Sequence, residues 1–187
     1  MDEFAVFILG AFLVLMLVIA RRRFASFHAQ TGEDCDHGYP VFELDKHLRG
    51  KMTCDGAIFG PFGRMTSTFV ADFDIQWDGK TGHMAETFRF NDGSTQDRLW
   101  IITLGQDGHF TAEADDVPGG GKGLQTGPAG QMLYVIKLPD GSGGHVLRTV
   151  DWMYLTPDGT IVNRSQFRKF GFKVAELVAT MRKVDLA

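Results

Sequence analysis

Asp-Gly pairs recur along the chain and constrain its fold more than any other feature. After Gly50 they stand at residues 55–56, 78–79, 92–93, 107–108, 140–141 and 158–159. Both residue types tolerate the positive φ of tight turns, so Asp-Gly between apolar stretches is a strong hairpin signal. The pairs at 78, 92 and 107 are 14 and then 15 residues apart, which is one strand and one turn each time. The spacing predicts a meander of antiparallel strands.

The segments between these turns alternate apolar and polar residues, as half-buried strands do. In 69–77, one face holds Phe69, Phe73, Ile75 and Trp77, and the other holds Asp72, Asp74 and Gln76. We expect about eight strands, near 51–60, 62–77, 82–91, 95–105, 108–117, 131–138, 145–155 and 160–164. A meander with one apolar face closes most economically into an up-and-down antiparallel β-barrel of the lipocalin type, whose interior can hold a small ligand. The predicted fold class is therefore all-β.

Two segments depart from the strand pattern. Residues 165–186 carry apolar residues at helical spacing, at Phe167, Phe170, Val174, Leu177, Val178 and Met181, and this predicts a C-terminal helix packed on the barrel. The Gly-rich stretch 118–123 does not fit a phosphate-binding loop, because Lys122 is followed by Gly123 rather than by Ser or Thr. We interpret it as a flexible inter-strand loop.

An apolar run from Phe4 to Ala20 contains no charged residue. Seventeen helical residues span about 26 Å, the short end of what a bilayer needs, and this predicts a transmembrane helix. A cleaved signal peptide is the alternative, but the chain starts Met1-Asp2-Glu3 instead of with a basic segment. Three arginines, 21–23, follow the run. The positive-inside rule then predicts a single-pass membrane protein with its soluble domain in the cytoplasm.

The remaining organisation follows from these elements. We expect an anchor at 1–23, a polar juxtamembrane linker at 24–40 and one barrel domain at 41–187, entered by a short helical turn within 41–49. A chain of 187 residues allows one such domain. Cys35 and Cys54 fit no zinc spacing and are either free or bridged.

Composition and motif searches exclude several function classes. The net charge of −4 argues against a nucleic-acid partner. The six histidines are scattered, so neither a metal site nor a catalytic triad is predicted. We predict no cofactor and assign no catalytic residue.

Charged residues on apolar strand faces are the most informative site signal. Glu86 and Arg98 lie among large apolar residues, and a three-residue turn at 91–93 would place them directly opposite each other. Arg148 shares a face with Val150 and Trp152. Buried charges need partners. They therefore predict an internal salt bridge, an anchor for the carboxylate or phosphate of an amphiphile, or an acid–base pair.

Several of these positions belong to a set of motifs that resembles a known family. The motifs are Glu86-Thr87-Phe88, Asp92-Gly93, Arg98-Leu99-Trp100, Asp116-Val117, Asp151-Trp152-Met153, Asn163-Arg164 and Lys169-Phe170-Gly171. Together they resemble the bacterial domain-of-unknown-function family 3833 over about residues 42–183. The resemblance implies a lipocalin-like envelope protein without an assigned activity. It also implies a link to lipids, because genes of the family frequently accompany genes for fatty-acid-modifying enzymes.

This chain departs from the family at its N-terminus. Family members often look like lipoproteins, whereas here the first cysteine is Cys35, far from the apolar run. A transmembrane helix replaces the lipidated cysteine. With the resemblance, this implies a single-pass protein of the bacterial inner membrane, and the periplasm, the usual place of the family, is the alternative to the cytoplasm for its soluble domain.

The predicted function is a membrane-anchored barrel that binds a fatty acyl or other lipophilic ligand, accessory to lipid modification or handling. The membrane and a membrane-bound lipid-modifying enzyme are its candidate partners. The predicted ligand contacts are Glu86, Arg98, Trp100, Tyr134, Arg148 and Trp152. One alternative is an isomerase- or hydratase-like enzyme that uses Glu86 or Asp151 as acid or base. Another is a non-catalytic subunit with a filled interior.

Overall fold

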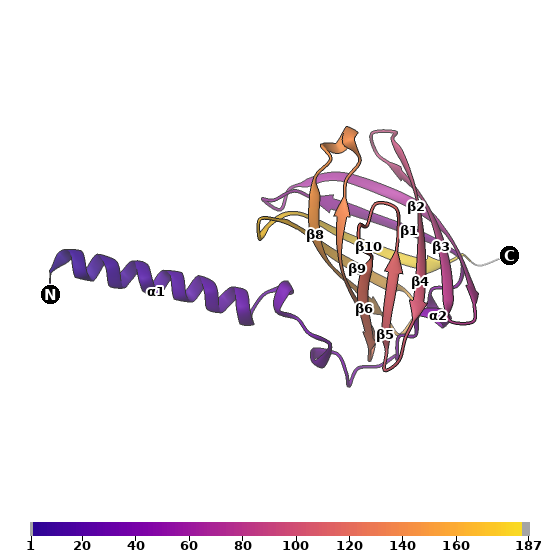
Figure 1. The fold of residues 1–187 in the computed structure, drawn as a ribbon, viewed down its shortest axis with the longest axis horizontal. Helices are drawn as coiled ribbons and strands as arrows, with labels where there is room; N and C mark the ends of the chain where they lie inside the picture. Colours follow the sequence, from indigo (N-terminus) through magenta and orange to yellow (C-terminus); the bar gives the residue numbers. More distant parts are fainter. Residues whose placement is uncertain (1, 185–187) are drawn as a thin grey trace.

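The computed structural model describes residues 2–184, which form a ten-stranded barrel preceded by a long helix (Figure 1). Helix α1 spans Glu3–Phe24, and short 3-10 turns lie at Phe27–Ala29, Gly32–Asp34 and Asp140–Ser142. Helix α2 spans Leu44–His47. The strands are β1 Gly50–Phe59, β2 Met65–Asp78, β3 Thr81–Phe90, β4 Thr95–Leu104, β5 His109–Glu113, β6 Gly121–Thr126, β7 Ala129–Lys137, β8 Val146–Leu155, β9 Ile161–Lys169 and β10 Phe172–Lys183.

The sheet is an antiparallel meander in which every strand pairs with its neighbours in sequence. The first and last strands close the barrel, with Cys54 opposite Met181. The predicted up-and-down barrel is confirmed, although with ten strands instead of eight. Closure leaves no free sheet edge along β1 and β10.

The predicted C-terminal helix is wrong. Residues 165–169 complete β9, and residues 172–183 form β10, while residues 185 and 186 lie outside the described part of the chain. Leu177, Ala179 and Met181 pack in the core at strand spacing. A short apolar series can satisfy helical and strand periodicity at once, and here pairing with β1 and β9 decides between them.

The Gly-rich stretch also contributes a strand, so its interpretation as a loop is wrong in part. Residues 121–126 form β6 between β5 and β7. A Cβ at Gly123 would collide with the ring of Phe110 on β5. Glycine has a low propensity for strands, so the sequence pattern argues against one here. In the structure the missing side chain makes room for the aromatic ring that lies across the strand.

The two ends of the barrel differ. At the closed end, which contains the turns at 79–80, 105–108, 127–128 and 156–160, helix α2 forms a plug. Leu44 and Leu48 are both 1% exposed, and the Trp77 indole N–H donates a hydrogen bond to the Leu48 carbonyl at 2.7 Å. The open end contains the turns at 60–64, 91–94 and 170–171 and the loops at 114–120 and 138–145.

The segment between α1 and α2 runs along the outer barrel wall, from the open end to the closed end. The Arg164 guanidinium lies 4.5 Å from the centre of the Phe27 ring, and the Tyr154 hydroxyl donates to Gln30 at 3.0 Å. Further along, the Phe42 N–H donates to the Gly127 carbonyl in the β6–β7 turn at 2.7 Å. These contacts hold the segment against β8 and β9.

Helix α1 projects away from the barrel and buries none of its side chains (Figure 1). The helix is long and apolar enough to cross a membrane. A signal sequence near the N-terminus would meet the same criteria of length and composition. In the last turn of α1, Arg22 donates a hydrogen bond to the Gly171 carbonyl of the barrel at 3.1 Å. The domain limits 1–23, 24–40 and 41–187 stay predictions.

Candidate functional site

An internal cavity of about 210 Å³ occupies the barrel. Most of its wall is apolar, with Phe69, Phe73, Phe88, Phe110, Met132 and Ile136 among the lining residues. Lining residues near the open end, such as Ile58, Phe90 and Leu138, are half-buried, whereas Leu44 and Leu48 at the closed end are fully buried. The cavity is therefore reached from the open end. It is smaller than pockets for drug-sized ligands, about 300–1,000 Å³, and so suits a slender ligand.

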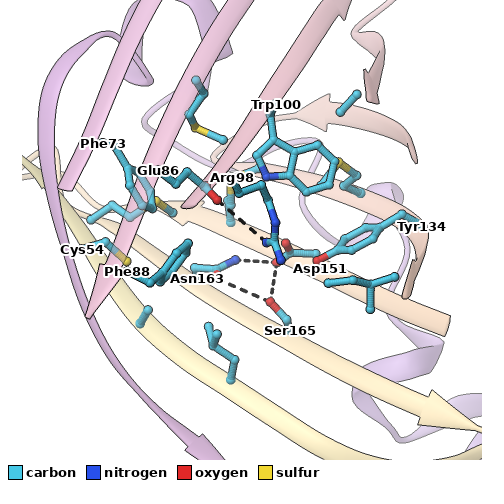
Figure 2. Close-up of a pocket in the computed structure, with 18 of the residues that line it drawn as sticks. Cys54, Phe73, Glu86, Phe88, Arg98, Trp100, Tyr134, Asp151, Asn163 and Ser165 are labelled. Atoms are coloured by element: carbon cyan, nitrogen blue, oxygen red, sulfur yellow. Dashed lines mark hydrogen bonds and ion pairs between the residues drawn. The ribbon is translucent and has the colours of Figure 1, made fainter. Parts of the chain in front are cut away.

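The predicted pairing of Glu86 with Arg98 is confirmed. They are register partners on β3 and β4, joined by the turn in which the Phe90 N–H donates to the Ser94 carbonyl. Inside the barrel the two side chains form a salt bridge, with Arg98 Nη1 lying 3.8 Å from Glu86 Oε2 (Figure 2). A closed hairpin register thus places both charges on the inner face.

Arg98 has a closer partner that sequence reasoning missed. Asp116, in the loop after β5, accepts hydrogen bonds from Arg98 Nε at 3.0 Å and from Nη2 at 2.7 Å. Both bonds converge on Asp116 Oδ2, and charge-assisted hydrogen bonds of this kind are roughly twice as strong as neutral ones. Glu86 is therefore the weaker partner of Arg98, and its Oε2 has no hydrogen-bond partner among the described residues.

A second carboxyl group faces the cavity from β8. Asp151 accepts hydrogen bonds from the Ser165 hydroxyl at 2.8 Å and from the Asn163 amide, both on β9 (Figure 2). Tyr134 on β7 and Trp100 on β4 line the cavity beside it, with their rings in edge-to-face contact at 5.5 Å. The Glu86, Arg98, Asp116, Asp151 and Tyr134 side chains are named here the interior cluster.

Burial changes the protonation of the interior cluster. It raises the pKa of Glu86 to about 7, although the Arg98 charge opposes the shift. Burial also raises the pKa of Asp151, against the hydrogen bonds from Ser165 and Asn163, and raises the pKa of Tyr134 well above its ordinary value. Near neutral pH, Glu86 is thus protonated in a large fraction of molecules. A protonated carboxyl group can donate a hydrogen bond to a ligand.

Cys54, another lining residue, is a free thiol, as is Cys35 on the outer wall. Burial raises the pKa of Cys54 to about 12. Since the thiolate is the nucleophilic form, Cys54 is a poor nucleophile here.

Two of the residues predicted to contact a ligand lie outside the cavity. On β8 the inward side chains include Asp151 and Met153, so Arg148 and Trp152 point outward. Arg148 is exposed, and Trp152 is fully buried between the outer wall and the linker, stacked on Tyr154. The expectation that they share the barrel interior is wrong. The linker covers the outer face of β8, and the barrel interior covers its inner face. Large apolar residues are therefore buried on both faces, and their positions do not reveal which face points into the barrel.

The closed antiparallel barrel with a cavity at its centre places the protein among the lipocalin-like barrels. More narrowly, the chain belongs to the family described as "Protein of unknown function (DUF3833)", whose profile matches residues 22–183. This confirms the resemblance drawn from its motifs. A search of curated proteins finds no match.

Solved structures with a similar fold support the same class. The S-type phycobiliprotein lyase from Guillardia theta aligns with a TM-score of 0.55 at 8% identity, over 76% of this chain and 91% of that one. A protein of unknown function from the DUF3598 family of Nostoc punctiforme aligns with a TM-score of 0.52 at 14% identity, over 78% of this chain. This chain spans 50% of the Nostoc protein. At these identities the likeness concerns the fold alone.

Proposed function

We propose that the protein is a membrane-anchored barrel that binds a slender lipophilic ligand, a lipid or fatty acyl group, and serves membrane lipid modification or handling. The observation that carries the proposal is the internal cavity, whose wall is mostly apolar and carries a small number of polar side chains, among them Glu86, Arg98 and Asp151. Apolar walls with a few convergent polar groups are typical of small-molecule sites.

The charges favour a ligand whose polar group is uncharged, such as an ester, amide or alcohol. Among the described residues of the interior cluster, three carboxyl groups face one guanidinium, which Asp116 already holds in two hydrogen bonds. A ligand carboxylate or phosphate would add negative charge and compete with Asp116 for Arg98. A carbonyl oxygen, in contrast, can accept a hydrogen bond from protonated Glu86 or from Tyr134.

The membrane part of the proposal rests on α1. The helix carries an uncharged run from Phe4 to Ala20, and the arginines 21–23 that follow favour a cytoplasmic barrel. A membrane-bound lipid-modifying enzyme is the proposed partner, because a barrel anchored in the same bilayer can deliver or withdraw a lipid chain there.

Native mass spectrometry with lipid extraction, on full-length protein purified from its own host membrane, tests ligand binding. Ala112 lines the cavity, whereas Ala85 lies exposed on the outer face of β3. We expect a lipophilic molecule to accompany the parent protein and the control A85L, and to be lost from A112L, which fills the cavity. Thermal unfolding checks that A112L still folds. A ligand-free parent protein, or equal ligand in A112L and A85L, would contradict the proposal.

A second candidate function is acid–base catalysis on a lipophilic substrate, as in an isomerase or hydratase. The observation in its favour is that Glu86, with a pKa of about 7, and Asp151 line one cavity. Incubation of the extracted lipid with the protein in deuterated water measures it. Deuterium incorporation that is lost in E86Q would make the protein an enzyme, and its absence from the parent protein would leave binding alone.

A further inference from the structure

Two neighbouring hairpin tips at the open end carry exposed aromatic rings. Phe62 in the β1–β2 turn is 92% exposed, and Phe170 and Phe172 around the β9–β10 turn are 90% and 75% exposed. The two hairpins lie side by side, since Phe59 pairs with Glu176 near their tips. Both project on the side of the barrel where α1 lies (Figure 1). A group of large rings at one end of a molecule marks an interaction surface.

The contact with α1 sets the depth of these rings relative to a bilayer. Arg22 stands in the last turn of α1, just past the apolar run, where a spanning helix leaves the hydrocarbon. Its guanidinium bonds to Gly171, the residue between Phe170 and Phe172, at 3.1 Å. The rings therefore lie at the level of the lipid head groups, the depth at which aromatic side chains concentrate in membrane proteins.

The charges around the tips also suit a bilayer surface. The chain as a whole carries −4, yet cations gather around these two tips. They come from the end of α1, the β1–β2 turn and the β9–β10 hairpin, and are Arg21, Arg22, Arg23, Arg64, Arg168, Lys169 and Lys173. Clusters of basic residues next to a membrane helix attract anionic phospholipids.

We propose that the β1–β2 and β9–β10 tips dock into the head-group region of the bilayer that α1 spans, with anionic phospholipids as the bound partner. The proposal rests on the membrane anchoring put forward above. If so, the open end of the barrel faces the bilayer. The segment between α1 and α2 then runs along the outer wall, away from the bilayer, to the closed end. A lipid chain then reaches the cavity from the bilayer directly, without crossing bulk water.

Tryptophan quenching by brominated lipids measures the docking on the full chain. The probe is F170W in phosphatidylcholine–phosphatidylglycerol vesicles whose acyl chains carry bromine. The matched control is Y39W, because Tyr39 is an aromatic residue of 84% exposure that lies near the β6–β7 turn at the closed end. We expect bromine to quench the emission that F170W adds to the parent protein, and to leave that of Y39W unchanged.

Alkaline carbonate extraction of the same vesicles separates the possible failures. If F170W is quenched no more than Y39W while the protein resists extraction, the anchor stands and tip docking is overturned. If carbonate removes the protein, the anchor fails and tip docking falls with it. Ligand retention in the cavity, measured by native mass spectrometry, is independent of both results.

A second variant tests the consequence for ligand entry. The triple variant F62S/F170S/F172S removes only exposed rings, so we expect it to fold and to stay anchored through α1. We expect slower transfer of a labelled lipid from vesicles into the barrel than for the parent protein and for Y39S. Equal transfer rates in all three proteins would overturn the direct route from bilayer to cavity.

Discussion

Two clusters of arginine and carboxylate groups, one inside the barrel and one on its outer wall, shift carboxyl protonation in opposite directions. Inside the barrel, Arg98 forms ion pairs with both Glu86 and Asp116, and burial raises the pKa of Glu86 to about 7. On the outer wall, Glu176 forms salt bridges with Arg164 at 2.5 Å and with Lys173 at 2.6 Å. Burial raises the pKa of Glu176 too, but hydrogen bonds from these cations outweigh it and the net shift is downward. Burial therefore sets the direction of the Glu86 shift against a single distant cation, whereas two close cations reverse the effect of burial at Glu176.

The largest expected effect is the loss of the interior cation. R98M leaves the buried Glu86 and the half-buried Asp116 without their positive partner, and removal of one member of a buried charge pair costs about 3–5 kcal/mol. Urea unfolding at pH 7 measures the loss of unfolding free energy. At pH 5 the deficit should shrink, because Glu86, whose pKa burial raises to about 7, then binds a proton.

The matched variant R164M on the outer wall sharpens this result. Its cation is half-exposed, and Lys173 stays beside Glu176, so we expect a loss of about 1 kcal/mol or less. Equal losses in R98M and R164M would mean that Arg98 is as well solvated as Arg164. The double variant E86Q/R98M should unfold less easily than R98M, since it buries one charge fewer.

A pH profile of stability tests Glu86 next. Its pKa in the folded protein, about 7, exceeds the ordinary 4.5, so the folded state binds the proton more tightly. The associated stability is complete below pH 4.5 and is lost as the pH rises towards 7, by about 3 kcal/mol at most. E86Q should flatten the profile between these limits. An identical slope in the parent protein and E86Q would show that Glu86 titrates normally.

The smallest effect belongs to Glu176, and its sign is opposite. With a lowered pKa, Glu176 adds stability above its ordinary pKa of 4.5, and this stability is lost as the pH falls through the folded value. Because its cations are partly solvated, E176Q should cost less than about 1 kcal/mol at pH 7. The difference between E176Q and the parent protein should vanish in acid. If E176Q were more stable than the parent protein at pH 7, the pKa of Glu176 would be raised like that of Glu86, and the two clusters would not differ in the direction of their shifts.

Short-range patterns predicted the inner site in part. The three-residue turn at 91–93 sets the register of β3 against β4, and this register brings Glu86 opposite Arg98. Asp116 could not be predicted in the same way, because it reaches Arg98 from an irregular loop that no hairpin register positions. The position of Asp151 is also beyond sequence patterns, because the larger apolar residues of β8 predict the opposite face of that strand to be the inner one.

The amino-acid sequence alone determined the meander, the inner Glu86–Arg98 pair, the apolar N-terminal helix and the family, because turns, alternation and neighbouring register act over a few residues. Only the tertiary structure decided that 172–183 close the barrel as a strand, since that choice depends on pairing with β1, more than a hundred residues away. It alone also decided which face of β8 is internal. The linker covers Trp152 from outside, and long-range burial of this kind leaves no local pattern in the sequence.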